Sequence, residues 1–278
     1  MSTTLTVFLG KVNNYLGDNI SGTTDDDGNA AKTTFVDSAL SKYDDLYFGD
    51  PERNPEWWAY ISSTLRSIKT SQSSGGVITV HKAFAAQVAS ATAYELHRFD
   101  RDNKIIACNQ ALDDAYPLYY NRHEDATTLD GKGGSDNEYE VPNTFTEFPS
   151  QIWQKHTSTS LITYTEITNY KAVEIGGTMK FYATIVENDD VVLVGKKYLT
   201  QFTNDASTTE LTNAQAAVVA LLATSIFYRT LSGIVNAADS SRFDSLAIRF
   251  EEMYEQKKYL HAMPFILSQE INHGWLDE

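Results

Sequence analysis

Histidine and carboxylate side chains are the residues of this sequence that could carry out acid–base chemistry or bind a metal ion. No two histidines stand at a spacing typical of metal ligands, and no HExxH motif occurs. His97, within Glu95–Asp100, and His123, before Glu124 and Asp125, could each form half of an acid–base pair. Surface and capping roles are more common, so we predict no catalytic residue and no metal ligand. The six histidines are His81, His97, His123, His156, His261 and His273.

Neighbouring carboxylates are frequent, as expected of a chain with 37 acidic residues. We interpret the pairs Asp44–Asp45, Asp113–Asp114, Asp189–Asp190 and Glu251–Glu252 as residues of turns and solvated faces. A glycosidase needs two carboxylates facing each other in a groove, and the sequence leaves that open. Aromatic side chains that could stack on sugar rings keep a carbohydrate-binding or carbohydrate-cleaving module as an alternative, although core or interface packing is favoured for them: Trp57, Trp58, Tyr119, Tyr120 and Trp153.

Two polar runs lack the spacing of ligand-binding loops. The run Asp25–Asn29 does not have the alternating acidic ligands of an EF-hand, and the glycines of Gly131–Ser135 do not match a P-loop. The single cysteine, Cys108, excludes a disulfide framework and fits a small buried apolar side chain. We therefore expect no cofactor.

Helical periodicity marks the two ends of the chain and one segment inside it. Leu5–Leu16 has a helical apolar stripe, with Gly17 as its cap. A second helix, residues 102–117, has Asp102 as its expected cap and an apolar stripe containing Ile105, Cys108 and Leu112. Near the carboxyl end, Thr212 and Gln215 form a capping box before a pair of antiparallel helices.

Short strands separated by turns fill the middle of the chain. We expect strands at Leu46–Phe48, Trp57–Ile61 and Lys197–Phe202, a hairpin around Ser71–Gly76, and a loop over Glu124–Asn137. Further strands are expected across 138–202, with a hairpin turn at Gly176–Gly177. The pattern predicts an α+β fold with an antiparallel, sandwich-like or jelly-roll-like body. The expected divisions are 1–34 (helix and acidic loop), 35–205 (β-rich body with the inserted helix) and 206–278 (helical hairpin and tail).

Charge and composition restrict the class of protein. Acidic residues outnumber basic ones 37 to 22, for a net charge of −15, whereas holding DNA by its phosphates requires a basic face. The opening residues lack the features of a signal peptide, and the most apolar stretch, Ala214–Tyr228, is interrupted by polar residues. We expect a protein made in the cytoplasm that associates with no membrane.

The order of several segments along the chain allows a comparison with a known class of protein. They are Ser38–Gly49, Trp57–Ile61, Tyr94–Asp100, Ala107–Leu112 with Tyr116–Tyr119, and Glu138–Pro142 before the sheet, followed by the helical segments Ala214–Tyr228 and Arg242–Tyr254. Together they resemble the neck proteins of tailed bacteriophages, also called head–tail connectors or adaptors, over about residues 35–258.

The resemblance implies a structural virion protein with no catalytic residues. In such families usually twelve copies form a ring beneath the portal protein, an adjacent neck or tail protein binds the ring, and DNA passes through the channel without specific binding. The expected location is thus the virion neck, at the head–tail interface. A terminator, baseplate or fibre-attachment component of the tail is a second structural alternative.

The apolar residues of the carboxyl-terminal tail are candidates for docking to a partner. Phe265, Ile266, Leu267, Trp275 and Leu276 could anchor an arm in a groove of the portal. They could equally cover the protein's own sheet, and the sequence leaves both alternatives open.

Overall fold

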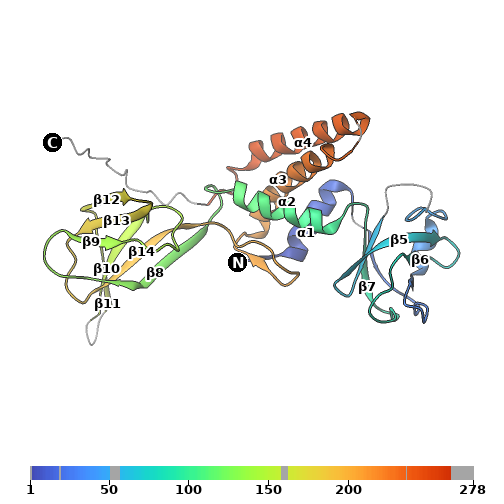
Figure 1. Ribbon diagram of the computed structural model, residues 1–278, viewed down its shortest axis with the longest axis horizontal. Helices are drawn as coiled ribbons and strands as arrows, with labels where there is room; N and C mark the ends of the chain where they lie inside the picture. Colours follow the sequence, from blue (N-terminus) through green and yellow to red (C-terminus); the bar gives the residue numbers. More distant parts are fainter. Residues whose placement is uncertain (1, 19, 51–56, 158–161, 236, 264–278) are drawn as a thin grey trace. The chain divides into compact units, whose positions relative to one another are not determined.

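The computed structural model describes residues 2–18, 20–50, 57–157, 162–235 and 237–263 (Figure 1). The described residues form four α-helices and antiparallel β-sheets, which confirms the predicted α+β class and its sandwich-like body. The chain divides into two compact units. Unit 1 comprises the described residues of 1–114 and 201–260, and unit 2 comprises those of 115–200 and 261–263.

Helices from three separate segments pack together in unit 1. They are α1 (Leu5–Leu16), α2 (Arg101–Asp114), α3 (Asn213–Ser232) and α4 (Ala237–Lys257). The central helix is α3, which contacts each of the other three. By length and composition α3 could also cross a membrane, but 61% of that stretch is buried inside the fold, as in the core helix of a globular protein.

Local signals explain where these helices begin and end. Gly17 adopts a left-handed conformation with φ of 65° at the end of α1, and the capping box of Thr212 and Gln215 opens α3. Both predictions are confirmed. The predicted cap of α2 was wrong by two residues, because the side chain of Asp100, and not that of Asp102, accepts a hydrogen bond from a backbone amide of the first turn, that of Asp102, at 2.9 Å.

A six-stranded antiparallel sheet completes most of unit 1. Its core contains Phe35, Ile68 and Leu96, all at most 1% exposed. The predicted hairpin at Ser71–Gly76 is confirmed. The strand order is β2 (Ile20–Thr23), β7 (Ala93–His97), β4 (Trp58–Ile61), β5 (Thr64–Gln72), β6 (Val77–Val80) and β3 (Thr34–Val36). A 3₁₀ turn, η1 (Ser38–Lys42), follows β3 in the chain. A separate two-stranded pair consists of β1 (Thr3–Thr4) and β15 (Thr208–Thr209).

Unit 2 is a sandwich of two antiparallel sheets. Tyr139 and Phe181 from one sheet and Ile152 and Leu193 from the other share one buried core. The predicted turn at Gly176–Gly177 joins two paired strands. One sheet has the order β11 (Ile162–Glu166), β10 (Gln151–Thr157), β14 (Asp190–Lys197), β8 (Asn121–Asp130), and the other has β12 (Tyr170–Ile175), β13 (Thr178–Ala183), β9 (Asn137–Glu140).

Three local predictions were wrong. Residues 124–130, expected in a loop, belong to β8, whose polar composition reflects its place at a sheet edge. Leu46–Phe48 forms a turn and bends rather than a strand, and the rings of Tyr47 and Phe48 pack against Trp57 and Tyr43. The last strand of the sandwich ends at Lys197, so residues 198–202 form the path back to the helices.

The chain leaves the helices after Asp114 and returns at Gln201. Asn109 of α2 binds both backbone groups of Phe202, donating to its carbonyl at 2.9 Å and accepting from its amide at 2.8 Å. The side-chain amide of Gln201 also donates a hydrogen bond to the Asp113 carboxylate, at 2.7 Å. The outgoing and returning segments are therefore held side by side within unit 1.

Candidate functional site

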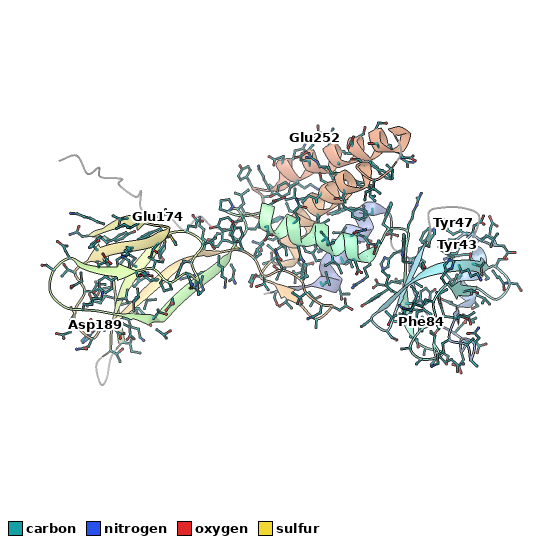
Figure 2. All side chains as sticks on the ribbon, in the orientation of Figure 1. Tyr43, Tyr47, Phe84, Glu174, Asp189 and Glu252 are labelled. Carbon is teal, nitrogen blue, oxygen red and sulfur yellow. The ribbon has the colours of Figure 1, made fainter. Side chains whose placement is uncertain are left out.

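The histidines and carboxylates singled out in the sequence lie in structural contacts. His156 Nδ1 lies 2.6 Å from Asp189 Oδ1, a carboxylate labelled in Figure 2, and His123 Nε2 lies 3.0 Å from the Thr144 hydroxyl. Within the described residues, no group of three His, Cys, Asp or Glu side chains is placed to hold a metal ion. His273 lies outside the described residues.

The paired carboxylates likewise bind neighbouring parts of the fold. Asp45 accepts a hydrogen bond from the Ser73 amide at 2.6 Å, and Asp190 forms an ion pair with Lys155 at 2.7 Å. Glu251 of α4 pairs with Arg229 of α3. These carboxylates tie turns and neighbouring elements together, as turn and surface residues do.

The aromatic candidates for sugar stacking are mostly used in packing. Tyr119 and Tyr120 are buried, at 0% and 4% exposure. Trp57 packs edge-on against Phe48, with ring centroids 5.2 Å apart, beside the stacked rings of Tyr43 and Tyr47. Trp153 lies partly exposed on β10. The packing favours the core interpretation for at least Trp57, Tyr119 and Tyr120.

A buried polar cluster in unit 1 is the strongest candidate for a functional site. Its centre is Lys104 of α2, whose side chain is 0% exposed. The Lys104 ammonium donates three hydrogen bonds, to Asn13 Oδ1 at 2.8 Å, to Asp18 Oδ2 at 2.9 Å and to His97 Nδ1 at 3.0 Å. All three protons of the ammonium are thereby used.

Asp18 links this cluster to the backbone. Its carboxylate, also 0% exposed, accepts from the amide of Arg98 at 2.5 Å and from that of Phe99 at 3.2 Å. It thus neutralises Lys104 and positions the turn between β7 and α2. Burial lowers the pKa of Lys104, an effect opposed by the charge of Asp18.

The contact with Lys104 determines the protonation of His97. An ammonium group has no acceptor, so His97 Nδ1 must be unprotonated and the ring proton lies on Nε2. Burial also lowers the pKa of His97, which favours the neutral ring. His97 Nε2 lies 3.0 Å from Glu95 Oε2, but without the alignment of a hydrogen bond. The contact lowers the pKa of Glu95.

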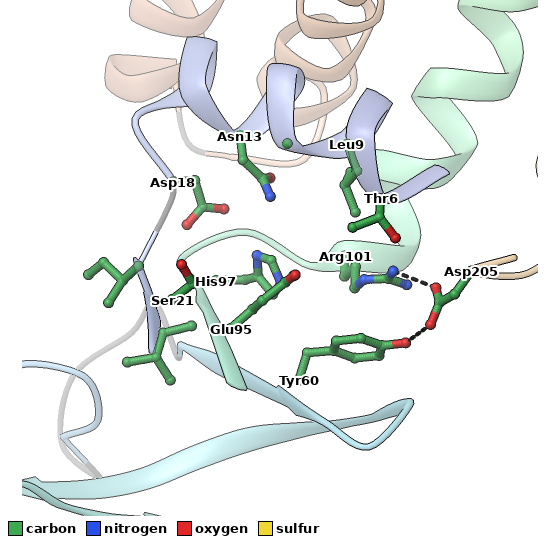
Figure 3. A pocket seen from close by; sticks show the side chains of 13 residues that line it. Thr6, Leu9, Asn13, Asp18, Ser21, Tyr60, Glu95, His97, Arg101 and Asp205 are labelled. Atoms are coloured by element: carbon green, nitrogen blue, oxygen red, sulfur yellow. Dashed lines mark hydrogen bonds and ion pairs between the residues drawn. The ribbon is translucent and has the colours of Figure 1, made fainter. Parts of the chain in front are cut away.

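A second group adjoins the cluster at the start of α2 (Figure 3). The Arg101 guanidinium donates to Asp205 Oδ1 at 2.6 Å and lies 4.1 Å from the centroid of the Tyr60 ring. The Tyr60 hydroxyl donates to the other oxygen of Asp205. Burial together with the hydrogen bond to Asp205 raises the pKa of Tyr60.

The two groups line a small cavity of about 100 Å³ (Figure 3). His97 Nε2 and Arg101 Nε, both buried and both without an aligned acceptor among the described residues, belong to side chains in its wall. Small-molecule pockets usually have about 300–1,000 Å³, so this cavity suits a few ordered water molecules. Glu95 and Asp205, which also line it, disfavour an anion there.

The arrangement can therefore fasten segments but shows no catalytic geometry. Lys104 and Arg101 each contact a carboxylate, and the cluster joins the end of α1, strand β7 and the start of α2. Cys108, one turn from Lys104, is buried in an apolar environment that raises its pKa to about 12, so it is a poor nucleophile.

Sequence reasoning singled out His97 but missed its partners. Lys104 and Arg101 lie on the buried face of α2 together with Cys108, although the expected apolar stripe contained Ile105. A lysine one turn before a buried cysteine is the signal that could have identified the cluster. The proposed docking residues Phe265, Ile266, Leu267, Trp275 and Leu276 lie outside the described residues.

Comparison with known proteins adds no family: no family model, no curated protein and no solved structure matches this chain.

Proposed function

We propose that this chain is a structural virion protein that forms a ring in the neck of a tailed phage, joining the portal to the tail around the DNA exit channel. The observation that carries the proposal is the order of the elements. Helices before, between and after the β-rich segments gather around α3, and α2 separates two β-rich regions. This is the order that the resemblance to neck proteins implies.

The use of buried charge supports a structural role. Lys104 and Asp18 are both fully buried and form an ion pair with each other. Asp18 also accepts a hydrogen bond from the backbone amide of Arg98. Such a network fixes the ends of α1, β7 and α2 relative to one another. A component of a pressurised conduit benefits from rigid connections of this kind.

The acidic character supports a channel that releases DNA. A net charge of −15 disfavours tight binding of phosphates, which is what a conduit requires. We expect the purified protein to bind duplex DNA weakly at low salt. Tight binding whose affinity falls steeply with salt would count against the channel.

Electron microscopy of phage particles assembled without this protein tests the proposal. The expected result is DNA-filled heads separated from complete tails. Normal, joined particles would reject a neck role. Joined particles without fibres, or with altered tail length, would instead indicate another component of the tail.

A further inference from the structure

The four-stranded sheet in unit 2 has two edge strands, β11 and β8. Strand β11 forms one edge and pairs with β10, and strand β8 forms the other edge and pairs with β14 (Figure 1). Among the described residues, no strand adjoins the outer side of either one. Outer strands of this kind are where another chain can add a strand to a sheet.

Strand β11 is exposed on both faces. All five of its residues, Ile-Thr-Tyr-Thr-Glu, are exposed, with Ile162 at 54% and Tyr164 at 57%. The strand contains β-branched and aromatic residues and has none of the usual protection of an edge, since it holds no proline, no lysine and no bulge. Such a strand is suited to pairing with another chain.

Strand β8 offers a matching edge over a limited length. From Asn121 to Asp125 it pairs regularly with β14, and the register shifts beyond that point. There Asp125 accepts hydrogen bonds at 3.0 Å from the amides of Thr127 and Thr128. Arg122–Asp125 of this regular part can pair with four of the five residues of β11.

Strand direction permits the two edges to join. Neighbouring strands in this sheet of four are antiparallel, so β11 and β8 run in opposite directions. A second copy in the same orientation places its β11 antiparallel to β8, with the solvent-facing sides of both sheets continuous. The contact joins two different surfaces, and such a contact generates a ring when the rotation closes.

Charge complementarity selects the register. Arg122 on β8 is exposed and neighbours Lys196 of β14, whereas Glu166 ends β11 and is also exposed. With Glu166 opposite Arg122, Tyr164 falls opposite Glu124 and Thr163 opposite Asp125, so Ile162 lies beyond the regular part of β8. The arrangement sets a basic end against an acidic end in a chain whose net charge of −15 otherwise keeps copies apart.

We infer that β11 of one copy adds to β8 of the next, antiparallel and with Glu166 beside Arg122, so that the sheet runs from subunit to subunit. The inference rests on the proposed ring, and it identifies the surface that builds it.

Charge reversal in the full-length chain tests the contact. Arg122→Glu and Glu166→Arg are each expected to weaken self-association about tenfold, and the double variant is expected to restore it. The measurement is native mass spectrometry together with light scattering over a concentration series. Lys171→Glu, an exposed basic residue on the edge strand β12 of the other sheet, is the matched control and should leave assembly unchanged.

The outcomes separate the interface from the function. Oligomers unaffected by both single reversals, or a wild-type chain that stays monomeric throughout, overturn the β8–β11 contact. The particle-assembly experiment above is independent of both results. Joined particles in that experiment would reject the neck role even if the strand pairing were correct.

Discussion

The Lys104 ammonium lies 3.0 Å from Nδ1 of His97, with both side chains almost completely buried. Two groups that each can carry a positive charge are thus in hydrogen-bond contact away from solvent. The contact is favourable as long as the imidazole is neutral and accepts the lysine proton. It makes the junction of α1, β7 and α2 sensitive both to mutation and to acid.

Removing the lysine should strongly destabilise unit 1. Lys104→Met leaves the Asp18 carboxylate buried without its counter-charge, and we expect a loss of about 3–5 kcal/mol in the free energy of unfolding. Urea denaturation measures it. Lys155→Met, which removes the lysine of the partly exposed pair with Asp190, should cost far less. Equal losses in the two variants would contradict the account of the cluster.

Stability should decrease as the pH falls below the ordinary His pKa of 6.5. The pKa of His97 is lowered in the folded chain, so the unfolded chain takes up the proton first and the free energy of unfolding declines. Above that pH the ring is neutral in both the folded and the unfolded chain, so His97 adds no pH dependence to the free energy of unfolding. Glu95, whose pKa is lowered from 4.5, adds stability that is lost in more acidic solution.

The variant His97→Asn isolates the histidine contribution. It keeps an acceptor for Lys104 but cannot titrate, so its unfolding free energy should depend less on pH in the window just below 6.5 than that of the wild type. Thermal denaturation across this range, with His123→Asn as the control, provides the comparison. Parallel curves for all three proteins would exclude His97 as the titrating group.

The turn of the β5–β6 hairpin requires glycine at position 76. Gly76 has φ of 63°, and a Cβ there would lie 1.8 Å from the carbonyl oxygen of Asp37. Gly76→Ala should destabilise the chain by well over the roughly 1 kcal/mol expected from backbone conformation. Gly177→Ala, at φ of 80° but with open space around it, should show the conformational cost without the clash.

The tail should bind the portal if the neck proposal holds. A chain ending at Ala262 is expected to lose attachment to isolated portal rings, and so is a full-length chain with serine at Phe265, Ile266 and Leu267. Co-sedimentation with the rings measures attachment. Full attachment of both variants would dispose of the docking arm and leave the alternative that the tail covers the protein's own surface.

Local sequence signals predicted the elements that depend on local chemistry. The Thr212–Gln215 capping box, the Gly17 cap and the Gly176–Gly177 turn each act through backbone groups a few residues away. The apolar stripe of α4, with Ala247 and Tyr254 on its buried face, likewise follows helical spacing. These signals were sufficient for the fold class.

The polar cluster could not be predicted because its contacts are distant in sequence. Lys104 meets Asn13 and Asp18, which are 91 and 86 residues away. A lysine in a helix is expected to face solvent unless its partner is known. The prediction of a loop in place of β8 failed for a related reason. The apolar residues Val191 and Leu193, which pair with this strand, belong to β14 and not to its own segment.

The pairing of Asn109 with both backbone groups of Phe202 has a consequence for the history of the chain. Because the outgoing and returning segments are clamped at their base, the sandwich is an insertion whose two ends are fixed within unit 1. We expect residues 115–200 to tolerate replacement in evolution more readily than the helices that hold those ends.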